Sequence, residues 1–84
     1  MNMKKIIRQY ILGNLLFTED KAALQDNDSF LESGIIDSTG VLEIILFIED
    51  TFSIKVTDDE MLPANLDSVD NLVDFIKRKQ LVAA

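Results

Sequence analysis

Apolar residues recur at helical spacing near the start of the chain. Within residues 4–17, the side chains of Ile7, Ile11 and Leu15 lie four positions apart, and charged residues cluster on the opposite side. This spacing predicts a helix of about three to four turns with one buried face. Gly13 weakens the pattern, because glycine lowers helix stability.

The most apolar stretch of the chain, residues 38–51, predicts a second helix. Asp37 precedes it and suits the N-cap position, because its carboxylate can accept from the unpaired amides of the first turn. At about 100° per residue, the face expected in the core holds Val41, Ile44, Ile48 and Phe52. A second stripe holds Thr39, Glu43, Leu46 and Asp50. Its mixture of acids with one leucine fits a docking face for a basic partner, and it equally fits a solvated helix face.

Residues 18–36 lack a sustained period and predict a long ordered loop, with one helical turn near residues 19–24. The side chains expected to anchor this loop in the core are Leu24, Phe30, Leu31 and Ile36. The run Asp26-Asn27-Asp28 is reminiscent of a calcium loop, but Phe30 occupies a ligand position and the required glycine is absent. No metal site is therefore predicted.

After the second helix, residues 52–56 alternate like a strand, yet no other segment offers a partner strand. They predict an extended linker that places Ile54 or Val56 in the core. Thr57 and Glu60 have the spacing of a capping box, which begins a short third helix.

Pro63 is expected to end that third helix, because proline disrupts a helix interior. Asp67 or Ser68 is expected to cap the last helix. The buried stripe of that helix is expected to hold Val69, Leu72, Val73 and Ile76, with Phe75 at its edge. The pattern as a whole predicts one all-α domain over residues 1–84, a small four-helix bundle with three longer helices, a short third helix and a long loop between the first two.

Charge is unevenly distributed along the chain. The formal net charge is −7, and residues 18–76 hold fifteen acids against Lys21 and Lys55, which gives −13. This segment repels nucleic acid and anionic membranes and attracts basic protein surfaces. We therefore expect protein partners and no nucleic acid.

The composition excludes several function classes. The chain has no cysteine and no histidine, so it offers neither a disulfide nor the usual base for a serine nucleophile. No catalytic residue is predicted, and an independent hydrolase is disfavoured. No apolar run approaches the roughly 20 residues of a membrane span, so a soluble cytoplasmic protein is expected. We also expect a monomer.

Ser38 is the strongest candidate for a functional site. It follows the Asp37 cap and falls on the first turn of the second helix, where amide groups are free and the helix dipole is positive. An anionic group attached to its hydroxyl would be stabilised there. The same residues also fit an ordinary helix cap.

The stretch from Phe30 to Glu43, which contains the Asp37-Ser38 pair, resembles the loop and second helix of acyl carrier proteins, and the resemblance extends over roughly residues 5–79. In that family the serine of an Asp-Ser motif receives 4'-phosphopantetheine. The resemblance implies a bundle of acyl-carrier type, with Ser38 as the attachment site and Asp37 as the flanking residue read by a phosphopantetheinyl transferase. It also implies a partner-binding region consisting of Thr39, Leu42, Glu43, Leu46, Glu49, Asp50 and Val56.

The sequence identifies the group carried by the arm less clearly than it identifies the attachment site. The commonest family motif is Asp-Ser-Leu, whereas Thr39 and Gly40 follow the serine here, which is more similar to the Asp-Ser-Met-Gly of D-alanyl carrier proteins. One hypothesis is an acyl carrier of fatty acid, polyketide or specialised lipid biosynthesis, whose partners include acyltransferases or ketosynthases. The alternative is an aminoacyl or peptidyl carrier loaded by a dedicated adenylating ligase.

A further alternative, from another class, is an unmodified acidic helical adaptor, which would tolerate Ser38→Ala. The role of Phe47 is also open at this point. Its ring either narrows a cargo slot between the helices or extends the docking surface.

Overall fold

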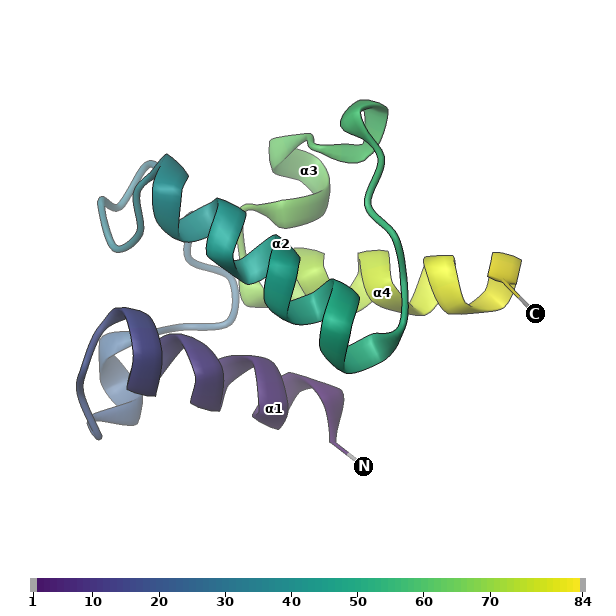
Figure 1. The fold of residues 1–84 in the computed structure, drawn as a ribbon. Coiled ribbons are helices and arrows are strands. Elements are labelled where there is room, and N and C mark those ends of the chain that lie inside the picture. Colours follow the sequence, from purple (N-terminus) through teal and green to yellow (C-terminus); the bar gives the residue numbers. More distant parts are fainter. Residues whose placement is uncertain (1, 84) are drawn as a thin grey trace.

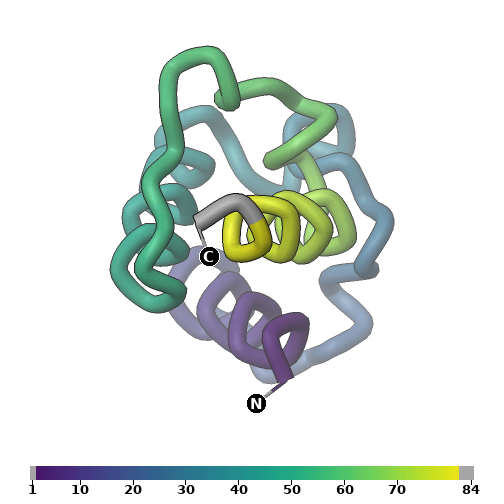
Figure 2. The backbone as a smooth tube through the Cα atoms, turned by 90° about the vertical axis from the view of Figure 1, so that its right-hand side faces the viewer, coloured from purple at the N-terminus to yellow at the C-terminus, as the bar shows by residue number. Residues whose placement is uncertain are grey.

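The computed structural model describes residues 2–83, and its regular elements are all helices, with no strand among these residues. Its four α-helices are α1 (Met3–Tyr10), α2 (Ser38–Phe52), α3 (Pro63–Leu66) and α4 (Val69–Ala83). Figure 1 shows α2 in front of α4, with α1 below these two helices and the short α3 above them. Viewed end-on in Figure 2, α4 lies between α1 on one side and α3 on the other. The predicted four-helix architecture, with a short third helix and a long first loop, is confirmed.

The first helix is longer than α1 alone. Residues Ile11–Leu15 continue it as a wider π-helical turn, in which the Leu16 amide donates to the Ile11 carbonyl at 3.0 Å. The turn contains Gly13, the weak point that the sequence indicated. The chain leaves it through Phe17, whose φ of 53° is left-handed.

The core lies between α1, α2 and α4. Fully buried side chains from all three helices meet the loop residues Leu24 and Phe30 there, and they include Ile7, Ile11, Ile44, Ile48, Leu72 and Ile76. Two expectations were wrong. Phe75 is only 2% exposed and belongs to the core, whereas Leu31 is 48% exposed and does not anchor the loop.

The long loop is held by polar contacts that the apolar pattern did not reveal. Asp67, between α3 and α4, accepts hydrogen bonds from the Ser29 hydroxyl and, at 3.1 Å, from the Leu31 amide. Asp26 pairs with Arg8 at 2.8 Å and with Lys4 at 3.3 Å. The side chain of the would-be calcium ligand Asp26 therefore fastens the loop to α1. A 3₁₀ turn, Lys21–Ala23, lies where one helical turn was expected.

The segment between α2 and α4 corrects one prediction. Thr57 and Glu60 form the predicted capping box, but the turn they begin, Asp58–Glu60, is a single 3₁₀ turn. Pro63 does not end a helix; it begins α3 at the first helical position, where its missing N–H costs nothing and its fixed φ is suitable. Ser68 caps α4, accepting from the Asn71 amide at 3.1 Å.

None of the helices described over residues 2–83 is both long enough and apolar enough to cross a membrane. The linker after α2 is extended rather than a strand, as predicted, and it buries Val56.

Candidate functional site

Ser38 is the first residue of α2, and the structure confirms Asp37 as its N-cap. The Asp37 carboxylate accepts from the Gly40 amide at 2.8 Å, and its carbonyl accepts from the Val41 amide at 3.1 Å. These bonds fix the first turn of the helix and leave the Ser38 side chain exposed. The hydroxyl is therefore held in one place and open to another molecule.

Gly40 is required by close packing beneath that first turn. A Cβ atom at this position would lie 2.4 Å from the Cγ2 methyl of Ile36, a buried residue that precedes the cap. Only glycine lets the start of α2 rest on Ile36. The glycine two positions after Ser38 thus has a structural cause in this chain.

The local electrostatics favour a negative group on Ser38. Within residues 2–83, the amides of Ser38 and Thr39 have no hydrogen-bond acceptor, and the positive end of the α2 dipole lies at the same point. The Asp37 carboxylate is already engaged by Gly40. A phosphodiester on the Ser38 oxygen would find free donors, so the residues present fit such a group.

An apolar groove opens beside Ser38 on the side of α3. It has a volume of about 280 Å³, and most of its wall comes from α2 and from the segment around α3. Its lining consists of Leu31, Ser38, Val41, Leu42, Ile45, Met61, Leu62, Pro63, Leu66 and Asp67. A flexible, partly apolar chain attached to Ser38 could lie along this groove, and the free end of that chain would remain in contact with water.

Four exposed apolar side chains surround the groove: Leu31, Leu42, Met61 and Leu62. The sequence pointed to Leu42 alone as a partner-binding residue. Leu31 and Met61 lie in loops, where no apolar period exists to signal them. Asp67, at the rim, was expected only as a possible helix cap, and its bonds to the loop depend on contacts distant in sequence.

The residues proposed for partner binding divide into two groups. Thr39, Leu42, Glu43, Leu46 and Asp50 are exposed along α2, as a docking face requires. Glu49 and Val56 are different. The Glu49 carboxylate accepts from the Val56 amide at 2.9 Å, and Val56 is only 7% exposed, so this pair holds the linker against α2 and adds little accessible surface.

Phe47 faces α1. Its ring stacks on that of Tyr10, with centroids 4.0 Å apart and an interplanar angle of 15°. It does not line the apolar groove, so it does not narrow that groove. Burial, followed by the charge of Glu43, raises the pKa of Tyr10 above its usual value.

Comparison with known proteins gives consistent matches. Residues 7–76 match the family model described as a phosphopantetheine attachment site. A D-alanyl carrier protein of Streptococcus uberis (strain ATCC BAA-854 / 0140J) is 35% identical over 65 residues, which is 77% of this chain and 81% of that protein. A D-alanyl carrier protein of Streptococcus pyogenes serotype M5 (strain Manfredo) is 35% identical over 69 residues, covering 82% of this chain and 86% of the other.

Among solved structures, the solution structure of a holo acyl carrier protein from Nitrosomonas europaea superposes with a TM-score of 0.75. The match covers 96% of this chain and 99% of that one at 24% sequence identity. At this level of identity the likeness supports the fold alone.

Proposed function

Because the chain belongs to the family that carries the phosphopantetheine attachment site, we propose that Ser38 bears the arm and that the cargo is a small amino acid activated by a separate ligase. The protein is a carrier with covalent 4'-phosphopantetheine, and it is not itself an enzyme. Membership of the carrier family also removes the reason to treat it as an unmodified adaptor.

The observation that carries the assignment is the setting of the Ser38 hydroxyl. It is exposed, it lies on the first turn of a capped helix beside free amides, and it opens onto an apolar groove. The other exposed serines, such as Ser33 and Ser53, lie in the loop before the cap and at the C-cap of α2. Neither faces the positive end of a helix dipole.

The chemistry asked of this chain is limited. The Ser38 Oγ attacks the phosphorus of coenzyme A that carries the pantetheine, the bond from this phosphorus to the 3',5'-adenosine bisphosphate breaks, and the serine proton passes to a base on the transferase. The chain has no histidine to perform this step alone, which agrees with a serine that is a substrate rather than a catalyst. Once attached, the arm supplies a thiol that holds the cargo as a thioester.

The relatives and the core support a small cargo. The matched Streptococcus proteins are D-alanyl carriers. The core of this chain is filled by side chains that are fully buried, among them Phe30, Ile44 and Ile48, whereas the groove beside Ser38 lies at the surface. A small amino acid needs no interior slot, because its ammonium and short side chain remain hydrated.

An apolar acyl group is the second candidate, and the groove favours it. Leu42, Met61 and Leu62 line the groove and are exposed, so they could cover part of a hydrocarbon chain and gain about 25 cal/mol per Å² of apolar area buried. An acyl carrier would use this wall to shelter its cargo between partners.

Two enzymes are required by this proposal: a phosphopantetheinyl transferase and an adenylating ligase. The exposed acids Glu43 and Asp50 on α2 form no ion pair within residues 2–83. They are therefore available to attract basic surfaces on such enzymes and to speed encounter.

The experiment has two stages. The protein, its Ser38→Ala variant and the control Ser33→Ala are incubated with coenzyme A, magnesium and a broad-specificity transferase, and their intact masses are measured. We expect one phosphopantetheine on the wild type and on Ser33→Ala, and none on Ser38→Ala. A gain on Ser38→Ala, or no gain on the wild type, would refute the attachment site.

The modified protein is then offered D-alanine with ATP and a D-alanine-activating ligase, or an apolar acyl chain with an acyl-activating ligase. Efficient aminoacylation supports the amino-acid carrier. Acylation by the apolar chain alone would transfer the assignment to the second candidate and leave the role of Ser38 intact.

A further inference from the structure

A second hollow lies beside the attachment site, on the side of α1. Its lining includes the two chain neighbours of Ser38, Asp37 and Thr39, together with Glu43, Ile35 and Phe17. The apolar groove on the side of α3 is lined by a separate set of residues, which includes Ser38 itself. The two hollows share no lining residue, so the attachment site has two distinct flanks.

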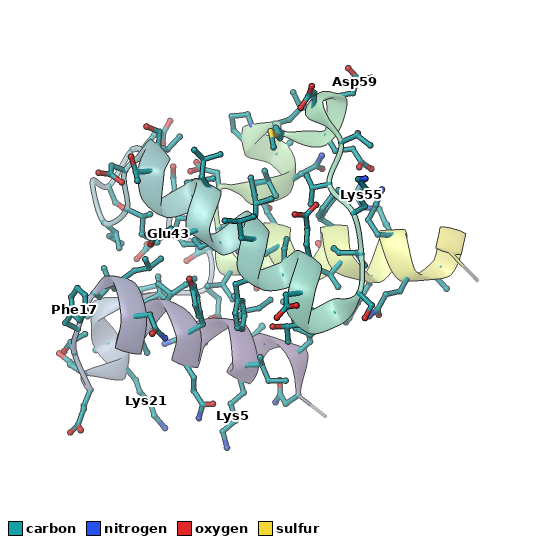
Figure 3. All side chains as sticks on the ribbon, in the orientation of Figure 1. Lys5, Phe17, Lys21, Glu43, Lys55 and Asp59 are labelled. Atoms are coloured by element: carbon teal, nitrogen blue, oxygen red, sulfur yellow. The ribbon has the colours of Figure 1, made fainter. Side chains whose placement is uncertain are left out.

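Phe17 is the unusual residue of this flank. Its side chain is 81% exposed, and its φ of 53° is left-handed, a conformation uncommon for an aromatic residue. Figure 3 shows Phe17 at the end of α1, with Glu43 on the adjacent part of α2. No packing contact within the core accounts for a large apolar ring in this position, whereas a contact with a second protein would.

The charge of the hollow indicates what such a protein presents. Asp37 and Glu43 are its charged residues, and no lysine or arginine lines it. An adjoining hollow between α1 and α2 shares the lining residues Asn14 and Glu43 with it and is also lined by Asp50. A basic side chain, arginine above all, can bind a carboxylate and stack on an aromatic ring at once.

We propose that Phe17 extends the acidic partner-binding face of α2, which includes Glu43, across this hollow and contacts a basic segment of the phosphopantetheinyl transferase. The transferase must bring its own catalytic groups to the Ser38 oxygen, so it necessarily covers Asp37 and Thr39, which line this hollow. A loading ligase reacts at the far end of the arm and has no such need to contact the start of α2. This inference rests on the proposed function, because it requires Ser38 to be the modified residue.

The test is the steady-state rate of arm transfer from coenzyme A to the carrier, with magnesium and a broad-specificity transferase. Phe17→Ala is expected to raise the KM for the carrier about 10-fold with kcat unchanged, as for the loss of an aromatic contact residue. Phe17→Tyr should restore most of the affinity. The matched control is Leu81→Ala, because Leu81 is 78% exposed on α4 and should have no effect.

Glu43→Gln is expected to raise KM several-fold and to weaken the dependence of KM on salt, because an attractive charge is lost. Its control, Asp59→Asn, removes an exposed acid that lies beyond α3 in Figure 3 and should leave both properties unchanged. Far-UV circular dichroism of each variant checks that the helices are retained.

A wild-type KM for Phe17→Ala would overturn the inference while the proposed function stands. So would an equal effect of Leu81→Ala, or an effect of Phe17→Ala that appears only when a ligase loads the finished carrier. Absence of modification on the wild type would instead overturn the proposed function, and the inference with it.

Discussion

The substitution Gly40→Ala tests how the start of α2 is held in place. Replacing glycine by alanine inside a helix normally stabilises it by up to about 1 kcal/mol. Here the added Cβ would lie 2.4 Å from the Cγ2 methyl of Ile36. That methyl belongs to a β-branched side chain with a stiff χ1 angle, and Ile36 is only 5% exposed, so it cannot simply turn aside.

Overpacking of this kind costs about 1–3 kcal/mol. We therefore expect Gly40→Ala to lower the free energy of unfolding by about 1 kcal/mol net. Ile36→Leu removes the branched methyl at little change of volume. In that background the clash is relieved, and Gly40→Ala should become neutral or stabilising, which corresponds to a coupling of about 1–2 kcal/mol between the two sites.

Urea unfolding followed by far-UV circular dichroism, on the wild type, both single variants and the double variant, measures this coupling. Stabilisation by Gly40→Ala in the wild-type background would refute the packing argument. An equal cost in both backgrounds would do the same, because it would separate the effect of Gly40 from Ile36.

Three further predictions concern the polar contacts. The hydrogen bond from Lys79, at 2.8 Å, lowers the pKa of the Glu60 carboxyl in the folded protein. The stability that this bond contributes is therefore complete above the ordinary carboxyl pKa, and it is lost as the pH falls through the lowered pKa of folded Glu60. Lys79→Met should therefore flatten the acid limb of stability, measured by urea unfolding across the acidic range, and an unchanged limb would contradict this. Glu43→Gln should lower the pKa of Tyr10 but leave it above its usual value, because burial is the larger cause; absorbance titration of phenolate is selective here, since the chain has one tyrosine and no tryptophan. Asp67→Ala should destabilise the fold by about 1–3 kcal/mol. It should also speed amide hydrogen exchange in the long loop more than Asp67→Asn does. Equal exchange rates in Asp67→Ala and the wild type would show that the loop is held by other contacts.

The helices with strong local signals could be predicted from the sequence. Asp37 before an apolar run marks the start of α2, and the pair Asp67-Ser68 marks the start of α4, because caps depend on residues within one turn. The burial of Ile7 and Ile11 could be predicted from their spacing of four residues. These features need no knowledge of distant parts of the chain.

Other features depend on packing between segments far apart in sequence, and local patterns do not contain that information. Phe75 lies at the edge of the periodic stripe of α4, yet its side chain is only 2% exposed in the folded chain. Leu31 is exposed because the Asp67 bonds, and not its own side chain, anchor the loop. Pro63 has two roles allowed by local chemistry, as a helix end or as a first residue, and only the structure distinguishes them.

The candidate site shows the same division. Ser38 and its cap were evident from sequence, because a helix start is a local feature. The apolar wall contributed by Met61, and the restraint that Glu49 places on Val56, arise only when the linker folds back along α2.

The central claim is that the arm is attached to Ser38, and residue-level mass spectrometry tests it most directly. The protein is modified by the transferase and digested, and the peptide that contains Ser33, Ser38 and Thr39 is fragmented. We predict that phosphopantetheine is found on Ser38 alone. Its presence on Ser33 or Thr39, or its absence from this peptide, would contradict the account.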